Sequence, residues 1–328
     1  MGRDNIIGID VGYGRTKFHS DTAEGSVPSA VSSQVAEETF DRKLSPVVVA
    51  GQAYLTGEEA LIHSRSCEDP RHSGFLASPG WFALLGTALY KAKFDPLGGT
   101  LVLGLPPGEA SEEREAWLAR TVRGTSVLIP KAGLTFRFDH TRIIIIPQAA
   151  GIFYHYAAHA DVDAFDLDIA VVDIGHQTVD MVYISGGGYV ERLKRTLDLG
   201  VGGEIDAIAQ MARSSAVPRK VRHGDIVAGI FDGSLFDAAH PHYVAGAEEH
   251  LAAYTRNLVS QIDQFMESLP SDPYGCVVAG GGAPLLRNQM GLYRSNLLVA
   301  EEPEMANARG YWTYASWLDE EEAHGTER

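Results

Sequence analysis

The sequence is poor in cysteine and in basic side chains, and it has no long apolar run. Its two cysteines, Cys67 and Cys276, form no Cys-x-x-Cys pair, and no His-rich cluster occurs, so we expect reduced thiols and no structural metal site. No run approaches the ~18 apolar residues that a membrane helix needs. Lys and Arg number 27 against 43 Asp and Glu. The net charge of −16 therefore argues against direct binding to nucleic acid or to an anionic membrane.

Two common nucleotide-binding motifs are also missing. No Gly-x4-Gly-Lys-Ser/Thr phosphate loop occurs in the chain. Gly12-x-Gly14 lacks the third glycine of a dinucleotide-binding turn, because Lys17 stands in its place. Residues 1–5 are short of apolar side chains, so we expect no signal peptide and a cytoplasmic protein. The length of 328 residues is enough for two domains with sizeable cores.

Residues 6–18 have the pattern of a buried strand that turns tightly and pairs back on itself. An apolar run ends in Asp10, and Gly12, Gly14 and Lys17 follow. The glycines permit positive φ and let a ligand approach the backbone closely. Successive N–H groups in such a turn form an anion-binding nest, and Lys17 adds a positive charge suited to phosphate. Asp10, at the strand end, can hold Mg²⁺ directly or through water.

The same arrangement returns at residues 170–182. Asp173-Ile-Gly175 repeats the phrase Asp10-Val-Gly12, again after an apolar run. Either stretch alone is compatible with an ordinary β-hairpin. Together they indicate two related halves, each of which brings a hairpin to a shared phosphate.

A third glycine-rich turn lies near the C-terminus. Residues 276–279 read as a short strand, Gly280 to Gly282 follow, and Ala283 begins a helix. Three glycines between a strand and a helix allow a ligand to lie flat on the backbone. Asn307 begins a final helix.

Apolar spacing predicts the main helices. One is expected over residues 81–92, with its aromatic and leucine side chains in a core, and another after Ser111 as N-cap. A third is expected over residues 204–213, and a long one from about 244 to 269 with a buried apolar stripe. The charged tail, residues 319–328, is expected to fray.

Apolar runs predict strands at residues 100–105, 125–130, 133–138 and 142–146. The last contains four isoleucines without alternation, which indicates burial on both faces. We therefore expect residues 142–146 to form a central strand of a sheet covered by helices.

The order of these motifs resembles that of the actin/sugar-kinase/heat-shock-chaperone ATPase superfamily. Asp10-x-Gly-x-Gly-x-x-Lys17 looks like its first phosphate motif, and Asp173-x-Gly-x-x-Thr178 looks like the second. The segment from Pro147 to Gly151 is similar to the first connecting motif. Gly280 to Gly282 resembles the adenosine motif, and Asn307 to Gly310 the second connecting motif. The resemblance extends from residue 6 to about residue 315.

Two further stretches, residues 104–106 and 199–203, resemble the prokaryotic actin-like proteins of the plasmid-partitioning (ParM) type. This resemblance implies an α/β, actin-like fold, that is, a duplicated ribonuclease H-like fold of two domains, each with a large and a small subdomain, around a nucleotide cleft. The implied boundaries are 1–155 for domain I, with a small subdomain at about 25–95, and 156–328 for domain II, with a small subdomain at about 204–268. The final helix, about 307–318, is expected to pack back on domain I.

The resemblance also implies site residues. Gln148, Asp173 and Asp10 are the candidate catalytic residues, and Asp10 and Asp173 are the candidates for holding Mg²⁺ and its waters. Many plasmid-partitioning members carry Glu where this chain has Gln148. An amide is no strong general base but can orient an attacking water, which implies slow hydrolysis gated by assembly. Candidate nucleotide-binding residues are Asp10, Gly12, Tyr13, Gly14, Arg15, Thr16, Lys17, Gly175, His176, Gln177, Thr178, Gly202, Gly203, Glu204, Lys220, Gly280, Gly281, Gly282 and Ala283.

The function that the resemblance implies is a filament-forming ATPase that uses ATP, with GTP as an alternative, and Mg²⁺. Its partners would be further copies of itself and a DNA-bound adaptor protein. Two other functions remain open: a small-molecule kinase of the same superfamily, for which Asp180 is a candidate base, and a nucleotide-gated interaction module without polymerisation. Glu204 and Lys220 would contact ribose or base, or else be solvated surface charges.

Overall fold

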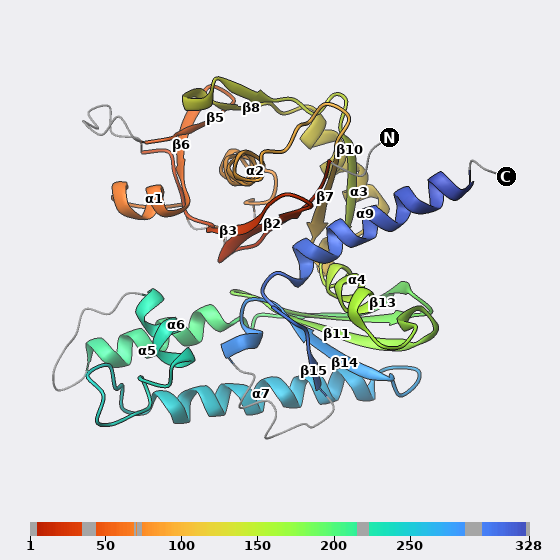
Figure 1. Cartoon of the computed structure of the whole chain (residues 1–328). Helices are drawn as coiled ribbons and strands as arrows, with labels where there is room; N and C mark the ends of the chain where they lie inside the picture. Colours follow the sequence, from red (N-terminus) through yellow and green to blue (C-terminus); the bar gives the residue numbers. More distant parts are fainter. Residues whose placement is uncertain are drawn as a thin grey trace. The chain divides into compact units, whose positions relative to one another are not determined.

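The chain folds into two units (Figure 1). Unit 1 comprises Met1–His159 and Met305–Arg328, and unit 2 comprises Ala160–Glu304. The computed structural model describes residues 5–34, 44–68, 70, 74–214, 223–285 and 297–325. The chain thus leaves unit 1 once and returns to it for its last helix.

Unit 1 is built on a five-stranded sheet of order β10-β7-β1-β2-β3. The central strand β1 pairs antiparallel with β2 and parallel with β7. β2 pairs antiparallel with β3, and β7 pairs parallel with β10. The strands are β1 Ile6–Val11, β2 Arg15–Ser20, β3 Glu24–Pro28, β7 Thr100–Leu105 and β10 Arg142–Pro147.

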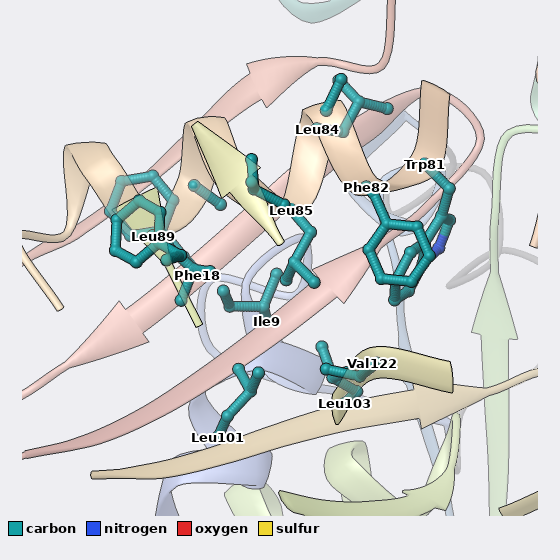
Figure 2. Packing of buried hydrophobic residues seen from close by; sticks show 14 of the residues in the cluster. Ile9, Phe18, Trp81, Phe82, Leu84, Leu85, Leu89, Leu101, Leu103 and Val122 are labelled. Carbon is teal, nitrogen blue, oxygen red and sulfur yellow. The ribbon is translucent and has the colours of Figure 1, made fainter. Parts of the chain in front are cut away.

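Helices cover both faces of this sheet. Successive side chains of a strand point to opposite faces, so each strand contributes side chains to a core on either side. Ile7 and Ile9 of β1 pack in a core with α2 and α3, and Figure 2 shows Ile9 beside Leu85 of α2. Ile6 points the other way and packs with Tyr311 of α9. The helices are α2 Pro79–Lys91, α3 Glu112–Arg123, α4 Ala150–His159 and α9 Ala306–Gly325.

The expectation of a central strand at residues 142–146 is wrong. β10 is the edge strand of the sheet, and its residues Arg142 to Ile145 are only half-buried. Ile143 and Ile145 contact the core of α2 and α3, whereas Ile144 and Ile146 contact that of α9. An edge strand with helices over both faces thus has the same unbroken apolar sequence as a central one.

A second, smaller sheet of unit 1 has the order β4-β6-β5-β8-β9. It shares one core with the large sheet, since α2 contacts strands of both. The expected segment 25–95 omitted β8 and β9, which join this sheet from beyond residue 95. The strands are β4 Val31–Ser32, β5 Val47–Val49, β6 Gln52–Thr56, β8 Val127–Ile129 and β9 Leu134–Phe136, and α1 Gly57–His63 follows β6.

Two helix starts in unit 1 follow from local sequence. Ser111 accepts a hydrogen bond from the backbone N–H of Arg114, 3.3 Å away, which confirms it as the N-cap of α3. Ser78 caps α2 through Trp81, and Pro79 occupies the first turn, where its missing N–H has no partner to lose. Short 3₁₀ turns lie at Pro107–Glu109 and Pro130–Ala132.

Unit 2 repeats the sheet topology of unit 1. Its sheet has the order β13-β12-β11-β14-β15, with β11 antiparallel to β12 and parallel to β14. β12 and β13 are antiparallel, and β14 and β15 are parallel. The strands are β11 Asp168–Ile174, β12 Val179–Ser185, β13 Gly188–Leu197, β14 Gly275–Ala279 and β15 Leu297–Val299, preceded by a 3₁₀ turn at Ala164–Asp166.

Three helices contribute to the core on one face of this sheet. They are α5 Val201–Arg213, α6 His223–Phe231 and α7 Ala247–Glu267. The apolar stripe predicted for the long helix is confirmed as core, since its side chains from Leu251 to Phe265 are buried against Ala170, Val172 and Val278. Residues 283–285 are helical, as expected after the triple glycine.

The C-terminal segment is more ordered than its composition indicated. α9 continues to Gly325, so the expected fraying from residue 319 is wrong for the part that the structure describes. Arg142 of β10 donates to Asp319 at 2.8 Å and to Glu322 at 2.7 Å. The local sequence did not indicate these contacts, because the partner of the two carboxylates lies far away in the sequence.

The two cysteines are free thiols, Cys67 exposed and Cys276 buried in β14. Burial raises the pKa of the Cys276 thiol to about 12.

Within the described residues, no helix combines the length and hydropathy that a membrane crossing requires.

Candidate functional site

The first hairpin of unit 1 brings three predicted residues together. Asp10, the last but one residue of β1, faces Lys17 of β2, whose Nζ lies 3.0 Å from Asp10 Oδ2. Gln148, just after β10, donates from Nε2 to Asp10 Oδ1 at 3.3 Å. Asp10 is 3 % exposed. A buried carboxylate therefore accepts hydrogen bonds from a cation and an amide at the end of the sheet.

The glycine turn lies close to this group. A Cβ built on Gly12 would lie 3.1 Å from the carbonyl oxygen of Arg15 and 3.8 Å from both Asp10 Oδ1 and Lys17 Nζ, so a side chain there would crowd the pair. Glycine avoids that crowding and permits a close approach of a ligand to the backbone. Tyr13, in the same turn, lies near Phe75, with ring centroids 6.5 Å apart.

Ser29 fixes the backbone of this glycine turn through two hydrogen bonds. It was not among the residues predicted from the sequence. Its hydroxyl donates to the carbonyl of Gly12 at 2.5 Å, and its N–H donates to the carbonyl of Gly14 at 3.0 Å. Thr16, predicted to contact nucleotide, is fully buried, and its hydroxyl lies 3.0 Å from that of Ser29. Arg15 points along the sheet, where its Nε donates to Ser26.

Gln148 sits in a tight turn between β10 and α4. Its N–H donates to the carbonyl of Leu105 at 2.6 Å. The next residue, Ala149, has φ 69° and donates its N–H to Asn307 Oδ1 at 3.1 Å. Asn307 begins the segment that resembles the second connecting motif, but it was not among the predicted site residues. No local signal links it to a turn 158 residues earlier.

In unit 2, Asp173 is the last but one residue of β11 and lies beside the triple glycine. A Cβ on Gly280 would lie 2.2 Å from Asp173 Oδ1, and Gly280 has φ 92°, so only glycine fits there. Gly282 donates its N–H to the carbonyl of Ile174 at 2.8 Å. Among the described residues, no atom lies within 4 Å of a Cβ position on Gly281. The predicted residue Ala283 is buried and donates its N–H to Gly280.

The second hairpin turn also abuts the start of α5. The carbonyls of His176 and Gln177 accept hydrogen bonds from the N–H groups of Gly202 and Gly200, at 2.7 and 2.8 Å. Gly175 closes the turn itself by donating to the carbonyl of Thr178 at 2.9 Å. Unit 2 thus joins three of the predicted segments: the turn, the helix start and the triple glycine.

Two predicted residues of α5 differ in their surroundings. No atom of the described residues lies within 4 Å of a Cβ position on Gly203. Glu204 lies 2.6 Å from Nε2 of His250 on α7, so it is paired within the unit. Lys220 falls outside the described residues.

Asp180 is a structural residue of unit 2. It is 5 % exposed and accepts hydrogen bonds from the hydroxyls of Thr178 and Thr196, at 3.0 and 2.5 Å. Burial raises the pKa of its carboxyl, and the two hydroxyls oppose that shift. A carboxylate enclosed in this way is poorly placed to take a proton from a substrate, which argues against the kinase alternative.

The side chains at this site are suited to hold Mg²⁺ mainly through the water molecules of its hydration shell. In the described part of the chain, no group of three or more His, Cys, Asp or Glu side chains is arranged to hold a metal ion. Mg²⁺ usually keeps several waters and takes one or two carboxylates with substrate phosphates. Asp10 already accepts from Lys17 and Gln148, so it is better suited to accept from metal-bound water than to replace it. The buried Oε1 of Gln177 has no hydrogen-bond partner among the described residues and can accept from a further donor.

Residues 8–151 match a family model described as the N-terminal domain of actin-like proteins. No curated protein sequence matches the chain significantly. Among solved structures, the chain is similar to Ta0583, an archaeal actin homologue, with a TM-score of 0.74 and 21 % identity, covering 95 % of this chain and 99 % of that one.

Two further similar structures are ParM proteins. One belongs to a 15-stranded ParM filament from Clostridium botulinum, with a TM-score of 0.72 and 20 % identity, covering 96 % of this chain and 99 % of that one. The other is Bacillus thuringiensis ParM with ATP, with a TM-score of 0.69 and 15 % identity, covering 97 % and 100 %. The chain therefore carries an actin-like N-terminal domain over residues 8–151 and has the fold of the prokaryotic actin-like proteins, the ParM type among them.

Proposed function

We propose that this protein is a nucleotide-dependent, filament-forming ATPase that acts in plasmid or DNA segregation or in intracellular positioning. The observation that carries the proposal is the group formed by Asp10, Lys17 and Gln148 beside the glycine turn. A hairpin of the same topology, with Asp173 near the end of its first strand, occurs in unit 2 beside the triple glycine. The group combines a cation for phosphate, an amide for water and a carboxylate for a hydrated metal ion.

Each residue has a definite task in the proposed hydrolysis. Lys17 donates to Asp10 and is the positive charge that would attract the phosphate oxygens. Gln148, bonded to Asp10, orients the attacking water. Asp10 and Asp173 would hold a hydrated Mg²⁺ ion, which would supply positive charge to neutralise the phosphates. The backbone at Gly280 to Gly282 supports the adenosine.

Coupling of nucleotide to assembly follows from the duplicated hairpins. In our proposal both hairpins bind one nucleotide, so nucleotide favours one conformation of the chain over others. A head-to-tail contact that fits this conformation best makes assembly dependent on nucleotide, and such a contact gives an open filament if it does not close into a ring. The similarity to a ParM filament and to an ATP-bound ParM supports this coupling.

The proposed partners are further copies of the chain and a DNA-bound adaptor protein. The net charge of −16 disfavours direct contact with DNA, so attachment to DNA requires a second protein. The same charge makes subunits repel one another. We therefore expect moderate salt to strengthen assembly, because the Debye length is ~8 Å at physiological ionic strength.

The test is light scattering and sedimentation at tens of micromolar protein with Mg²⁺ and ATP, GTP, ADP or a non-hydrolysable ATP analogue. We expect assembly with ATP that decays as phosphate is released, and longer-lived assembly with the analogue. The variant Asp173→Ala should remain folded and bind nucleotide but release no phosphate. A chain that stays monomeric with ATP and with the analogue, across salt concentrations, contradicts the filament proposal. Phosphate transfer to a small molecule in a substrate screen would then support the kinase alternative.

A further inference from the structure

We propose that Asn307 is a positioning residue that sets the place of Gln148 through the backbone of Ala149. This inference rests on the proposed function, in which Gln148 orients the attacking water. Asn307 is the third residue after the chain returns to unit 1 at Met305, and it lies in the first turn of α9. The residue that it positions lies before α4, far away in the sequence.

The backbone conformation of Ala149 needs a stabilising partner from elsewhere in the fold. Its φ of 69° lies in the left-handed region that residues with a Cβ rarely adopt. Its side chain is completely buried, and its N–H points to Asn307 Oδ1 at 3.1 Å, where Asn307 itself is 5 % exposed. A strained backbone conformation persists when its surroundings over-determine it. The buried amide oxygen of Asn307 supplies the partner for the strained N–H group.

Gln148 is consequently held from both sides. Its own N–H donates to Leu105 at the end of β7, and the following N–H donates to Asn307 on α9. Between these two anchors the backbone cannot rotate without breaking one of them. These two backbone hydrogen bonds do not fix the side chain of Gln148. Its Nε2 donates to Asp10.

The first turns of α9 pack closely against α4, because glycines at the crossing bring the two backbones into contact. A Cβ on Gly310 would lie 1.7 Å from the carbonyl oxygen of Gly151. A Cβ on Gly104, at the end of β7, would lie 2.0 Å from the hydroxyl of Tyr311 and 2.8 Å from Cγ of Gln148. Asn307 is therefore held on a rigid crossing, as a positioning residue requires.

The test uses three variants of α9. Asn307→Leu keeps the approximate size and removes the acceptor. Asn307→Asp keeps an acceptor oxygen, and its charge is tolerable because the first turns of both α4 and α9 favour an anion. Thr313→Val is the matched control: it removes a buried hydroxyl on the same helix that donates only to the carbonyl of Arg309. All variants are measured below their melting temperatures, as kcat and KM for ATP hydrolysis with Mg²⁺ and as affinity for a fluorescent nucleotide.

We expect Asn307→Leu to lower kcat by about 10- to 100-fold with nearly unchanged nucleotide affinity, since a displacement of about 1 Å near the chemistry has effects of this size. Asn307→Asp should recover most of the loss, and Thr313→Val should behave as wild type. Unchanged kcat in Asn307→Leu contradicts the inference, as does an equal loss in Thr313→Val.

A double-mutant cycle shows whether Asn307 acts through Gln148. If it does, Asn307→Leu has no further effect on kcat in a Gln148→Ala protein. Losses that multiply would show that Asn307 acts elsewhere and would overturn the inference.

Hydrogen exchange of the segment from Gln148 to Phe153 needs no turnover. It should be faster in Asn307→Leu and restored in Asn307→Asp. Unchanged exchange in Asn307→Leu contradicts the inference. A wild-type protein that releases no phosphate contradicts the proposed function, whereas the exchange data still decide whether Asn307 holds the turn.

Discussion

Lys17 faces Asp10 across the β1–β2 ladder, with its Nζ 3.0 Å from Asp10 Oδ2. In the second hairpin the same ladder position opposite Asp173 is held by Asp180. The two hairpins share their topology but not their charge: the first places a cation beside its carboxylate, and the second a buried acid held by two threonines. Phosphate charge is therefore balanced mainly from unit 1 in our proposal.

Replacing Lys17 by Met tests this asymmetry. The variant should bind ATP at least about 10-fold more weakly, because the cation for the phosphates is lost. It should also unfold more easily, by about 3 kcal/mol, since Asp10 stays buried without its cation. Isothermal titration and urea denaturation measure the two effects. The same substitution at the exposed Lys91 is the control, and equal nucleotide affinity in both variants would contradict the assignment of Lys17.

Asp180→Asn should stabilise the protein at pH 7 by about 1 kcal/mol, because the charged form of a buried carboxyl is the disfavoured form. The folded-state pKa of Asp180 is raised, so its charge lowers stability as pH rises through that pKa. The advantage of Asn should therefore vanish below the ordinary pKa of 3.8. Denaturation at pH 7 and at pH 3 measures it, with the exposed Asp161→Asn as control. Loss of catalysis without loss of stability would instead assign Asp180 as a base.

Glu24 attaches α9 to the β2–β3 hairpin. Arg309 donates to both of its oxygens, and His19 lies 2.7 Å from Oε2. The hydrogen bond from Arg309, followed in weight by that from His19, lowers the pKa of Glu24 to about 2, against the opposing effect of burial.

Stability from Glu24 should be present above pH 4.5, the ordinary pKa, and be lost as pH falls toward 2. Because about a third of the side chain is exposed, we expect Glu24→Gln to cost only about 1 kcal/mol at pH 6 and nothing at pH 2. Denaturant titrations at both pH values test this. Glu321→Gln, in an exposed part of α9, should be neutral, and a pH-independent loss in Glu24→Gln would exclude the ion pair as its cause.

Two glycine-to-alanine variants should have opposite effects. Gly310→Ala forces a Cβ to within 1.7 Å of a backbone oxygen, so it should destabilise the protein by about 3 kcal/mol. Gly203→Ala, in α5, adds a methyl group where no atom lies within 4 Å, so it should stabilise the helix by about 0.5–1 kcal/mol. Thermal unfolding compares them directly. A tolerated Gly310→Ala would mean that α4 and α9 can separate, which would also weaken the case for Asn307.

Much of the molecule could be predicted from local sequence. The two hairpins, the cap at Ser111 and the apolar helix after Ser78 depend on residues within a few positions of one another. Their signals are backbone preferences and side-chain periodicity, which act before the chain has folded. The fold class was implied by the resemblance of the ordered motifs to a known superfamily, and the comparisons confirm the actin-like fold.

Other features depended on contacts between distant segments. The isoleucine strand β10 lies at an edge, because helices from elsewhere cover its two faces. Asp319 and Glu322 are held by Arg142, and the turn of Gly12 is held by Ser29.

The sequence by itself determined the hairpins and their candidate residues, because apolar runs, glycines and charged side chains at short spacing favour one local conformation. Only the tertiary structure decided which distant residue each of these residues contacts. Asp10 meets Gln148 from 138 positions away, and Ala149 meets Asn307 from 158 positions away. Such pairs form only when strands and helices from separate parts of the chain pack together, and no local pattern records which partners that packing selects.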